Sequence, residues 1–329
     1  MALDNLLPII RKTGSNLSPE EFHHRVNVVF HDIEAEDYDQ IHKDMWEVLL
    51  LQFKLITGDF SKYFEKHSEL KLLDVGCGTG LGTELLLATE LGKKIKKIVL
   101  VDISSKMIEK AVARSKNWGI NTESRISMLD SLDEKADIIL TSSVLHHIPD
   151  LSQFASDIQK RLNLGGVFMH IHDPNGDQLM NPNLVARRKE IAATDKVTSL
   201  YQWLNSSEFY KSVFHRLNRM RGKYNHIDLV NNYLLKEGVI KKRMTAKEIW
   251  SITDIHVEGL PFSKKKGIRL SEMVNSLDEL SLVAHRSYGF YGRLGFELDE
   301  EFATKEKELI SSGSKEGRYL VAAWRKPVS

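Results

Sequence analysis

Short apolar segments alternate with amphipathic ones over the middle of this chain, which is the pattern of a parallel sheet covered by helices on both faces. Near-continuous apolar runs such as Ile98–Val101 and Ile138–Leu140 suit strands that are buried on both sides. The predicted strands span 70–75, 97–102, 123–129, 136–142, 167–172, 280–291 and 317–325, and helices are predicted over 81–91, 105–118, 151–162 and 270–277. We therefore expect an α/β fold with a doubly wound, seven-stranded, mostly parallel sheet.

The alternation is absent from two parts of the chain. The segment from Pro19 to Phe60 has helical periodicity, and Ser18 has the sequence context of an N-cap because a proline and two acids follow it. Residues 173–269 are also helical in period, with an apolar stripe formed by Trp203, Tyr210, Phe214, Leu217 and Tyr224. We expect N-terminal helices over 1–60, a sheet domain over 61–172 and 270–329, and a helical cap inserted over 173–269.

Composition limits the class of protein. With 329 residues, 42% of them hydrophobic, the chain can bury a large core. It has no apolar run of about 18 residues and no basic leader followed by an apolar stretch, so we expect neither a membrane span nor a signal peptide. The single cysteine, Cys77, excludes an internal disulfide framework and is typical of a reducing compartment. We expect a cytoplasmic protein.

Charge is unevenly distributed along the chain. Residues 185–270 carry 18 Lys or Arg against 8 Asp or Glu, a net charge of +10, whereas the rest carries 28 against 37, a net charge of −9. One interpretation is a set of solvated lysine faces on the cap. The other is that the cap attracts an anionic acceptor such as a carboxylate, a phosphate, an acidic peptide or RNA.

The most informative motif is the run KLLDVGCGTGLG, from Lys71 to Gly82, in which a strand ends in Asp74 and glycines follow at every second position. Only glycine tolerates both the positive φ angles of such a turn and a ligand pressed against its backbone. The helix that follows presents its N-terminal amides to the same place. The spacing does not fit the dinucleotide fingerprint G-x-G-x-x-G, because the third glycine position falls on Leu81 or Thr83.

Three further motifs follow in order. Asp102 ends the second predicted strand, where an acid can accept both hydroxyls of a ribose. Asp130 and Ser131 end the third strand. The fourth strand ends in small residues, among them Ser142, and the sequence LHHIPD follows it.

The spacing D-x-G-x-G-x-G and these three motifs resemble the class I S-adenosylmethionine-dependent methyltransferases over about Leu70–His172 and the two closing strands. The resemblance implies a Rossmann-like sheet that ends in an antiparallel hairpin, whose two strands are joined without a long helix. It also implies an S-adenosylmethionine site formed by Asp74, Gly76, Gly78, Gly80, Asp102, Ile103, Met107, Asp130, Ser131 and Ser142. Asp102 would hold the ribose, Ile103 and Met107 would flank the adenine, and Asp130 would accept its amino group.

The sequence also contains candidates outside the glycine turn. Asp37-Tyr38-Asp39 resembles the element with which many family members close a helix over the cofactor, so Tyr38 is a candidate ligand of the methionine carboxylate; the alternative is a tyrosine at the edge of the core.

His147 and His172 lie where the fourth and fifth strands end, at the ligand crevice of a parallel sheet. Either could act as a general base, and Asp173 could tune His172. The alternatives are satisfied histidines and a helix-capping turn before Pro174.

No metal site is expected. Asp254, His256 and Glu258 would share one side of a strand, but we interpret them as a surface that contacts the acceptor.

The leading functional hypothesis is an S-adenosylmethionine-dependent O- or N-methyltransferase whose basic helical cap encloses a small-molecule or peptide acceptor, which could carry a carboxylate. The alternatives are an RNA methyltransferase and a non-catalytic protein that binds S-adenosylmethionine. The oligomeric state and the need for a base are open at this point.

Overall fold

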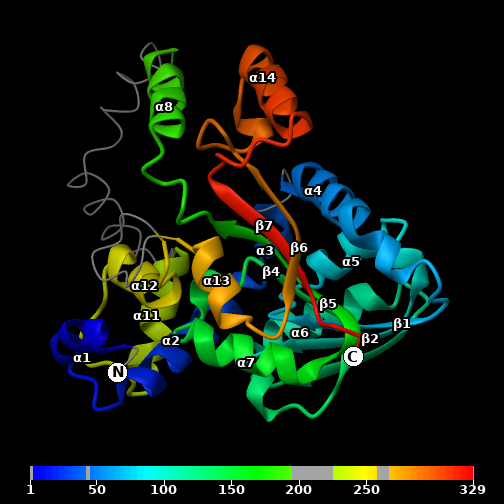
Figure 1. Cartoon of the computed structure of the whole chain (residues 1–329). Helices are drawn as coiled ribbons and strands as arrows, with labels where there is room; N and C mark the ends of the chain where they lie inside the picture. Colours follow the sequence, from blue (N-terminus) through cyan, green and yellow to red (C-terminus); the bar gives the residue numbers. More distant parts are fainter. Residues whose placement is uncertain (1–2, 42–44, 195–224, 258–266, 329) are drawn as a thin grey trace.

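A seven-stranded sheet forms the centre of the computed structural model, which describes residues 3–41, 45–194, 225–257 and 267–328 (Figure 1). Its strand order is β3-β2-β1-β4-β5-β7-β6. The strands are β1 (Leu70–Val75), β2 (Ile95–Asp102), β3 (Asn121–Ile126), β4 (Ala136–Ser142), β5 (Leu162–Pro174), β6 (Ser281–Tyr288) and β7 (Tyr319–Arg325). The first five pair in parallel, and β7 runs antiparallel to both β5 and β6. This arrangement confirms the expected Rossmann-like, mostly parallel sheet.

Helices cover both faces of the sheet because successive strand residues point to opposite sides. In β1, Leu72 joins the core beneath α4 (Met45–Phe60), α5 (Leu81–Leu87) and α6 (Ser105–Ser115), whereas Leu73 joins the core beneath α7 (Leu151–Arg161) and α13 (Leu270–Ser276). Helices of the sheet domain are α5 (Leu81–Leu87), α6 (Ser105–Ser115), α7 (Leu151–Arg161), α13 (Leu270–Ser276) and α14 (Glu300–Ser311). Short 3-10 turns are η1 (Asp4–Leu6), η2 (Ser61–Phe64), η3 (Gly92–Lys94), η4 (Leu129–Ser131), η5 (Leu145–His147) and η6 (Gly295–Glu297).

The connection between the last two strands differs from the expectation. The strands pair antiparallel as predicted, but α14 lies between them. Asp299 caps this helix through a 3.0 Å bond from the Phe302 amide. Glu306 of α14 then accepts the amides of Gly289 and Phe290, so the helix is held against the end of β6 by a buried carboxylate. The prediction of a connection without a long helix is wrong, because side-chain caps and contacts from outside the strands stabilise a helix here.

The N-terminal segment is helical, as predicted, but it is divided. Its helices are α1 (Leu7–Thr13), α2 (Pro19–Glu34), α3 (Tyr38–Ile41) and α4 (Met45–Phe60). The predicted N-cap is confirmed, because the Ser18 side chain accepts the Glu21 amide at 3.2 Å and the Glu21 side chain binds back. α4 covers the sheet, whereas α1 and α2 lie beside it (Figure 1).

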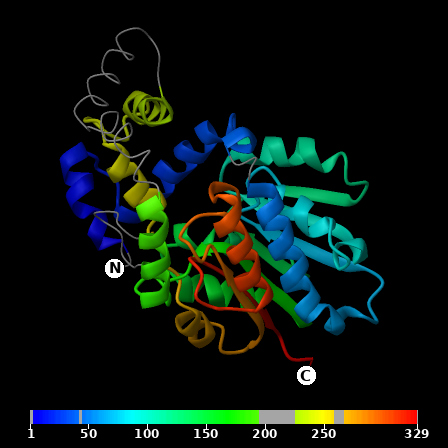
Figure 2. The same cartoon turned by 90° about the horizontal axis from the view of Figure 1, so that it is seen from above.

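The described part of 173–269 contains α8 (Pro182–Thr194), α11 (His226–Lys236) and α12 (Ala246–Thr253). α11 and α12 share one hydrophobic cluster with α1 and α2, and Figures 1 and 2 show these helices side by side. This helical layer (α1, α2, α11 and α12) therefore joins segments that are far apart in the sequence. The predicted stripe from Trp203 to Tyr224 lies outside the described residues.

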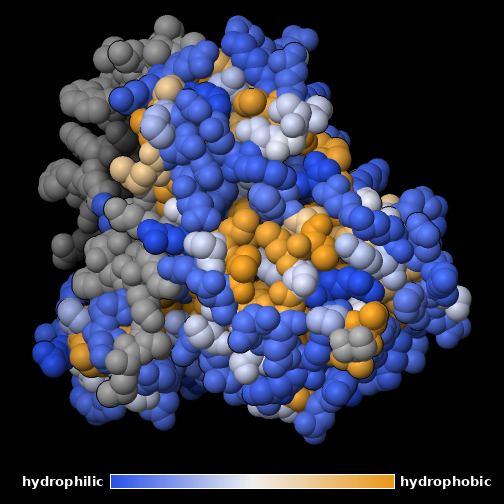
Figure 3. Space-filling model, in the orientation of Figure 1, coloured by the Kyte–Doolittle hydropathy of each residue, from blue (hydrophilic) through white to orange (hydrophobic). Residues whose placement is uncertain are grey.

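The surface is mainly hydrophilic on the face shown in Figure 3, and apolar surface gathers near its centre, where the edge strand β6 runs in Figure 1. The middle residues of β6 are half-buried. No helix in the described ranges has both the length and the apolar character needed to cross a bilayer.

Candidate functional site

The glycine turn after β1 is closed on one side and open on another. Gly76 and Cys77 donate their amides to the carbonyl oxygen of Val101 in β2 at 2.8 and 3.0 Å. The φ angles of Gly76 and Gly78 are +67° and +53°, in the region that favours glycine. A Cβ at Gly76 would lie 2.6 Å from a methyl carbon of Val144, whereas a Cβ at Gly78 would meet nothing within 4 Å. Gly76 is therefore required for packing, and Gly78 faces open space.

Asp102 is held beside that space by two backbone amides. Its Oδ2 accepts the Gly78 amide at 2.9 Å, and its Oδ1 accepts the Ser104 amide at 2.8 Å. Burial raises the pKa of the Asp102 carboxyl, and these amides and the nearby His31 oppose the rise. Each carboxylate oxygen retains a further lone pair for a ligand hydroxyl. The structure thus places Asp102 where the sequence expected it, at the carboxyl end of β2 and next to the turn.

Asp74 lies beneath the same turn and is only 1% exposed. Its Oδ2 accepts the Thr83 hydroxyl at 2.6 Å, whereas its Oδ1 is buried without a hydrogen-bond partner among the described residues. Burial raises the pKa of Asp74 to about 7, although the hydrogen bond from Thr83 works to lower it. A buried carboxylate oxygen without a donor is a site where a ligand's N–H or O–H group would be stabilised.

Helix α3 is tied to the glycine turn by its acid. Asp39 Oδ1 accepts the hydroxyl of Thr79, a residue of the turn, at 2.8 Å. The other oxygen of Asp39 is ion-paired with Arg114 of α6. Burial, together with the charges of Glu34 and Asp102, raises the pKa of Tyr38. The sequence analysis predicted that this element closes over the cofactor through Tyr38, which stays a prediction, and it did not single out Asp39, which contacts the glycine turn.

Helix α2 is anchored to the turn between β2 and α6. The Ser104 hydroxyl donates to Asp32 Oδ1 at 2.6 Å, and the Lys106 amide donates to the same oxygen at 3.2 Å. Ser104 also caps α6 by accepting the amide of Met107, which is buried, while Ile103 is half-buried. The expected adenine neighbours therefore lie at the junction of β2 and α6, where α2 is anchored.

The remaining predicted ligands lie at the ends of other strands. Asp130 and Ser131 form the exposed 3-10 turn after β3, and the Ser131 hydroxyl donates to Asp130 Oδ1 at 3.1 Å. Ser142 ends β4 and is half-buried, with its Cβ 3.0 Å from where a Cβ on Gly82 would lie. Gly80 has a φ of +84° and starts α5.

A second group of polar side chains lies at the ends of β4 and β5. Asp173 is fully buried and accepts bonds from Nδ1 of His146 at 2.8 Å and from Nδ1 of His170 at 3.0 Å. Burial opposes ionisation of Asp173, but these two bonds outweigh it and hold its pKa well below the ordinary value. Burial also works to lower the pKa of His146, but the bond and charge of Asp173 outweigh it and raise that pKa.

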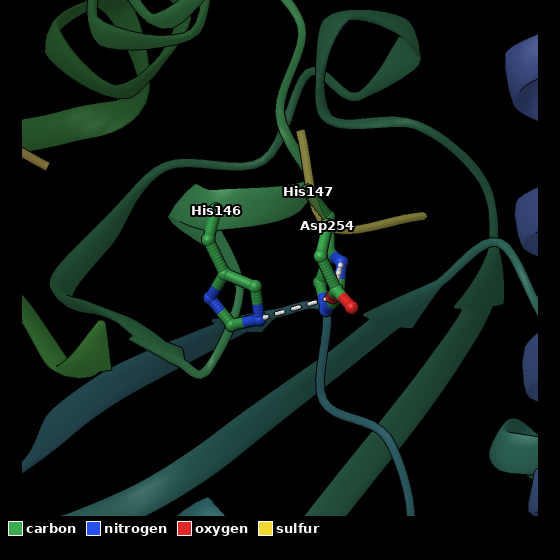
Figure 4. Close-up of side chains that lie close together, drawn as sticks. All are labelled: His146, His147 and Asp254. Atoms are coloured by element: carbon green, nitrogen blue, oxygen red, sulfur yellow. Dashed lines mark ion pairs between the residues drawn. The ribbon is translucent and has the colours of Figure 1, made fainter. Parts of the chain in front are cut away.

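His147 and Asp254 complete this group (Figure 4). Nδ1 of His147 lies 2.8 Å from the carbonyl oxygen of Thr253, which can only accept, so this nitrogen carries a proton. The same nitrogen is 3.4 Å from Asp254 Oδ1, and His146 Nε2 is 3.8 Å from it. Burial and the neighbouring His146 lower the pKa of His147. The three side chains are close enough together to hold a metal ion, a set that the sequence analysis did not identify.

His172 has a different neighbourhood from the one predicted. Its Nδ1 is hydrogen-bonded to the hydroxyl of Tyr288, and its ring stacks on Tyr319 with centroids 4.4 Å apart. The prediction that Asp173 tunes His172 is wrong, because both oxygens of Asp173 are bonded to His146 and His170. A φ of +67° at His172 explains the difference, since this backbone turn breaks the alternation of side chains along β5.

His31 of α2 connects the two groups. Its ring lies edge-on to His147, with centroids 5.1 Å apart, and Asp102 and Asp254 both contribute to its electrostatic environment. Burial works to lower the pKa of His31, but its bond to Glu34 and these charges raise it. The glycine turn and the histidines therefore border one region at the carboxyl edge of the sheet.

The prediction that Asp254 and His256 share one side of a strand is wrong. Asp254 and His256 follow the end of α12 in a turn, so they do not alternate along a strand. Asp254 faces the histidines, whereas His256 Nε2 lies 2.8 Å from the carbonyl oxygen of Ile148. Glu258 lies outside the described residues.

Comparisons with known proteins identify relatives of part of this chain. Residues 66–224 match a family described as "Methyltransferase domain". The chain is 34% identical over 102 residues to a ubiquinone biosynthesis O-methyltransferase of Paramagnetospirillum magneticum, covering 30% of this chain and 39% of that protein. It is 30% identical over 115 residues to the protein of the same name from Rickettsia conorii, covering 34% and 38%. The chain thus spans about two fifths of the length of these relatives.

Among solved structures, an S-adenosylmethionine-dependent methyltransferase from Clostridium acetobutylicum is similar with a TM-score of 0.43 and 12% identity, covering 88% of this chain and 99% of that one.

Proposed function

Because this chain carries a methyltransferase domain with the class I fold, we propose that it binds S-adenosylmethionine at the glycine turn and transfers the methyl group to a small-molecule acceptor. The observation that carries the proposal is the open space at Gly78, with Asp102 fixed beside it by the Gly78 and Ser104 amides. When bound, S-adenosylmethionine supplies an electrophilic methyl group on a sulfonium. The chain has to hold a nucleophile behind that methyl group and exclude water.

The cofactor fits the residues present at the turn. Asp102 offers two oxygens for the ribose hydroxyls. The buried Oδ1 of Asp74 has no donor among the described residues, and a ligand N–H or O–H group could supply one. Ile103 and Met107 flank the adenine in this proposal, and Asp130 accepts its amino group. Tyr38 reaches the methionine carboxylate, while Asp39 holds its helix on Thr79.

The acceptor site in this proposal lies between the carboxyl edge of β4 and β5 and the helical layer. His146 and His147 face this region from the sheet domain, and Asp254 faces it from the end of α12. The relatives named for ubiquinone biosynthesis are O-methyltransferases, which favours an oxygen nucleophile here. His147 and His172 remain candidates for contact with the acceptor.

The domain organisation follows from the same proposal. Residues 1–60 cover the cofactor, and 173–269 form a cap over the acceptor, inserted between two parts of the sheet domain. The parallel bridge between Asn175 and Ile268 brings the start and the end of this insertion side by side. A basic cap would favour an anionic acceptor, although Arg187 is already ion-paired with Glu316 at 3.3 Å.

Isothermal titration with S-adenosylhomocysteine tests the cofactor half of the proposal. We expect saturable binding by the wild type and by Asp133→Asn, an exposed control, and weaker binding by Asp102→Asn. Equal affinity in all three proteins would remove Asp102 from the site, and no binding to any would contradict the proposal.

A transfer assay with methyl-labelled S-adenosylmethionine tests the acceptor half. The probes are 3,4-dihydroxybenzoate, which carries both phenol and carboxylate groups, an amine, an acidic peptide and a structured RNA. Product mass and fragmentation identify the methylated atom. Label in RNA that disappears steeply with salt would favour the RNA alternative. Binding of S-adenosylhomocysteine without label in any probe would favour the non-catalytic alternative.

A further inference from the structure

Three histidines at the carboxyl edge of the sheet differ in the group that holds Nδ1. A buried carboxylate, Asp173, holds His146; a backbone carbonyl, at Thr253, holds His147; and a phenol, Tyr288, holds His172. The partner of one ring nitrogen sets the tautomer and the basicity of the other. These three side chains therefore differ in their ability to accept a proton.

We infer that His146 takes the proton of a hydroxyl acceptor through Nε2, with Asp173 as its positioning residue. The inference rests on the proposed function and specifies its substrate class as a phenol, enol or alcohol. Such a group carries a proton at neutral pH and becomes a stronger nucleophile when it loses that proton. A carboxylate acceptor would need no base.

The contacts of His146 fix its tautomer. A carboxylate oxygen can only accept, so Nδ1 carries the proton that is donated to Asp173, and the neutral ring has its lone pair at Nε2. Asp173 cannot readily turn away, because its Oδ1 also accepts the His146 amide at 3.2 Å and its Oδ2 is bonded to His170. The buried carboxylate then stabilises the imidazolium that forms, as in a catalytic triad.

The groups around His146 favour this role. Asp173 of β5 and Asp254 after α12 are the negative groups that face it. The neighbouring titratable bases are His147, His170, which shares Asp173, and, further away, His31 of α2. Nε2 is 3.8 Å from Asp254 Oδ1, which is too long for a hydrogen bond. The His146 side chain is 13% exposed, so it is largely shielded from bulk water but not fully buried.

The proton and electron balance is simple. The O–H proton of the acceptor moves to His146 Nε2. The electron pair of the oxygen forms the new O–CH₃ bond, while the sulfur–methyl bond breaks and its electron pair stays on sulfur, which gives S-adenosylhomocysteine. The imidazolium of His146 then releases the proton to solvent.

A metal bound by His146, His147 and Asp254 is the competing use of the same side chains. The geometry favours the base, because the His147 nitrogen nearest to Asp254 already donates its proton to Thr253. A metal at that nitrogen would have to displace this proton and leave the buried carbonyl without its donor.

Nitrogen NMR of the ¹⁵N-histidine-labelled full chain, saturated with S-adenosylhomocysteine, tests the inference without an acceptor. We expect neutral His146 to be protonated at Nδ1, to titrate at higher pH than His147, and to titrate at lower pH in Asp173→Asn. The signals that disappear in His146→Gln identify those of His146 in the wild-type spectrum. A neutral His146 protonated at Nε2, or one that titrates below His147, would overturn the assignment.

Kinetics with an acceptor from the transfer assay provide the second test. We expect His146→Gln to lower kcat about 10²- to 10⁴-fold, the range for a general base, with affinity for S-adenosylhomocysteine changed less than about 3-fold. Its residual rate should rise about tenfold per pH unit toward the pKa of the acceptor, whereas the wild-type rate levels off above the pKa of His146. Asp173→Asn should lower kcat with little change in KM.

The matched control is His67→Gln, an exposed histidine just before β1, at the opposite edge of the sheet. It should retain the wild-type rate and pH profile. Identical pH profiles for wild type and His146→Gln would overturn the inference, and so would a methyl ester as the product. Loss of transfer in EDTA with recovery on adding Zn²⁺ would assign the cluster to a metal instead. These outcomes leave cofactor binding intact, whereas failure of the proposed function abolishes it or leaves every probe unlabelled.

Discussion

The two halves of the sheet's carboxyl edge are built in different ways. At the ends of β1 and β2, backbone amides from the glycine turn and its neighbours hold Asp102. At the ends of β4 and β5, the partners come from more distant parts of the fold: the Asp173 side chain holds His146, and the carbonyl oxygen of Thr253, at the end of α12, holds His147. In the first half, the pairing of the neighbouring strands β1 and β2 brings the Gly78 amide to Asp102, whereas in the second half a helix outside the sheet supplies a partner.

Two buried aspartates show the contrast most clearly. Asp74, under the glycine turn, has one oxygen without a partner in the part of the chain that the structure describes, and burial raises its pKa. Asp173, under the histidines, has both oxygens bonded, and those bonds hold its pKa low. Charged Asp74 therefore destabilises the ligand-free fold, whereas charged Asp173 stabilises it.

The largest expected effect is the pH dependence that Asp74 causes. Its pKa of about 7 in the folded protein lies above the ordinary 3.8, so its stabilising contribution is complete below about pH 4 and is lost as pH rises through 7. Over this range wild type should lose about 4 kcal/mol at most relative to Asp74→Asn. Urea unfolding of both ligand-free proteins from pH 4 to 8 measures the difference. Parallel curves would show that Asp74 ionises normally.

Asp173→Asn should act in the opposite direction. Because its folded pKa is lowered, the carboxylate contributes stability at neutral pH that is lost as pH falls below its ordinary value. We expect the variant to unfold at pH 7 with about 3 kcal/mol less free energy, since two charged hydrogen bonds are weakened. The same urea series measures it, and a variant as stable as wild type at pH 7 would contradict the bonding described for β5.

A pair of glycine variants separates packing from binding within the turn. Gly76→Ala combines a positive φ with a Cβ only 2.6 Å from Val144, and we expect it to lower the free energy of unfolding by about 2 to 4 kcal/mol. Gly78→Ala has only the backbone strain, about 1 to 2 kcal/mol, but it fills the open space beside Asp102. It should therefore lose most affinity for S-adenosylhomocysteine while it remains folded. Unchanged affinity in Gly78→Ala would move the cofactor away from the turn.

Asp102→Asn should weaken S-adenosylhomocysteine binding by about 1 to 3 kcal/mol, because charge-assisted bonds to ligand hydroxyls become neutral ones. Titration calorimetry measures the loss, with Asp133→Asn as the matched exposed control. His146→Gln belongs in the same series, since an equal loss of affinity in that variant would show that the two halves of the edge do not divide the work as proposed.

The smallest expected effect concerns the contact between α3 and the turn. A double-mutant cycle of Asp39→Asn and Thr79→Val should show a coupling of about 0.5 to 1.5 kcal/mol in affinity for S-adenosylhomocysteine, the usual net value of one hydrogen bond. Arg114 remains ion-paired with Glu84 in both variants, which limits wider changes. Additive single effects would mean that α3 does not cover the cofactor through this bond.

The sequence pattern predicted most of the sheet and the position of the glycine turn and Asp102 at its carboxyl edge. The boundaries of β1 and β4 match their predictions, because apolar runs bounded by glycines and small residues determine both burial and strand ends. Asp102 and the glycines lie where their motifs placed them, because β1 and β2 pair in parallel and bring the turn after β1 beside the end of β2.

The partners of the histidines at the other half of the edge depend on long-range packing. The sequence paired Asp173 with its neighbour His172, but a positive φ at His172 turns that ring toward Tyr288 and leaves Asp173 to His146, 27 residues earlier in the chain. Asp254 follows α12 rather than lying on a strand, and its position beside His147 depends on the helical layer packing against the sheet. Local periodicity describes which face a residue takes, but it contains no information about partners that long-range packing brings within hydrogen-bond distance.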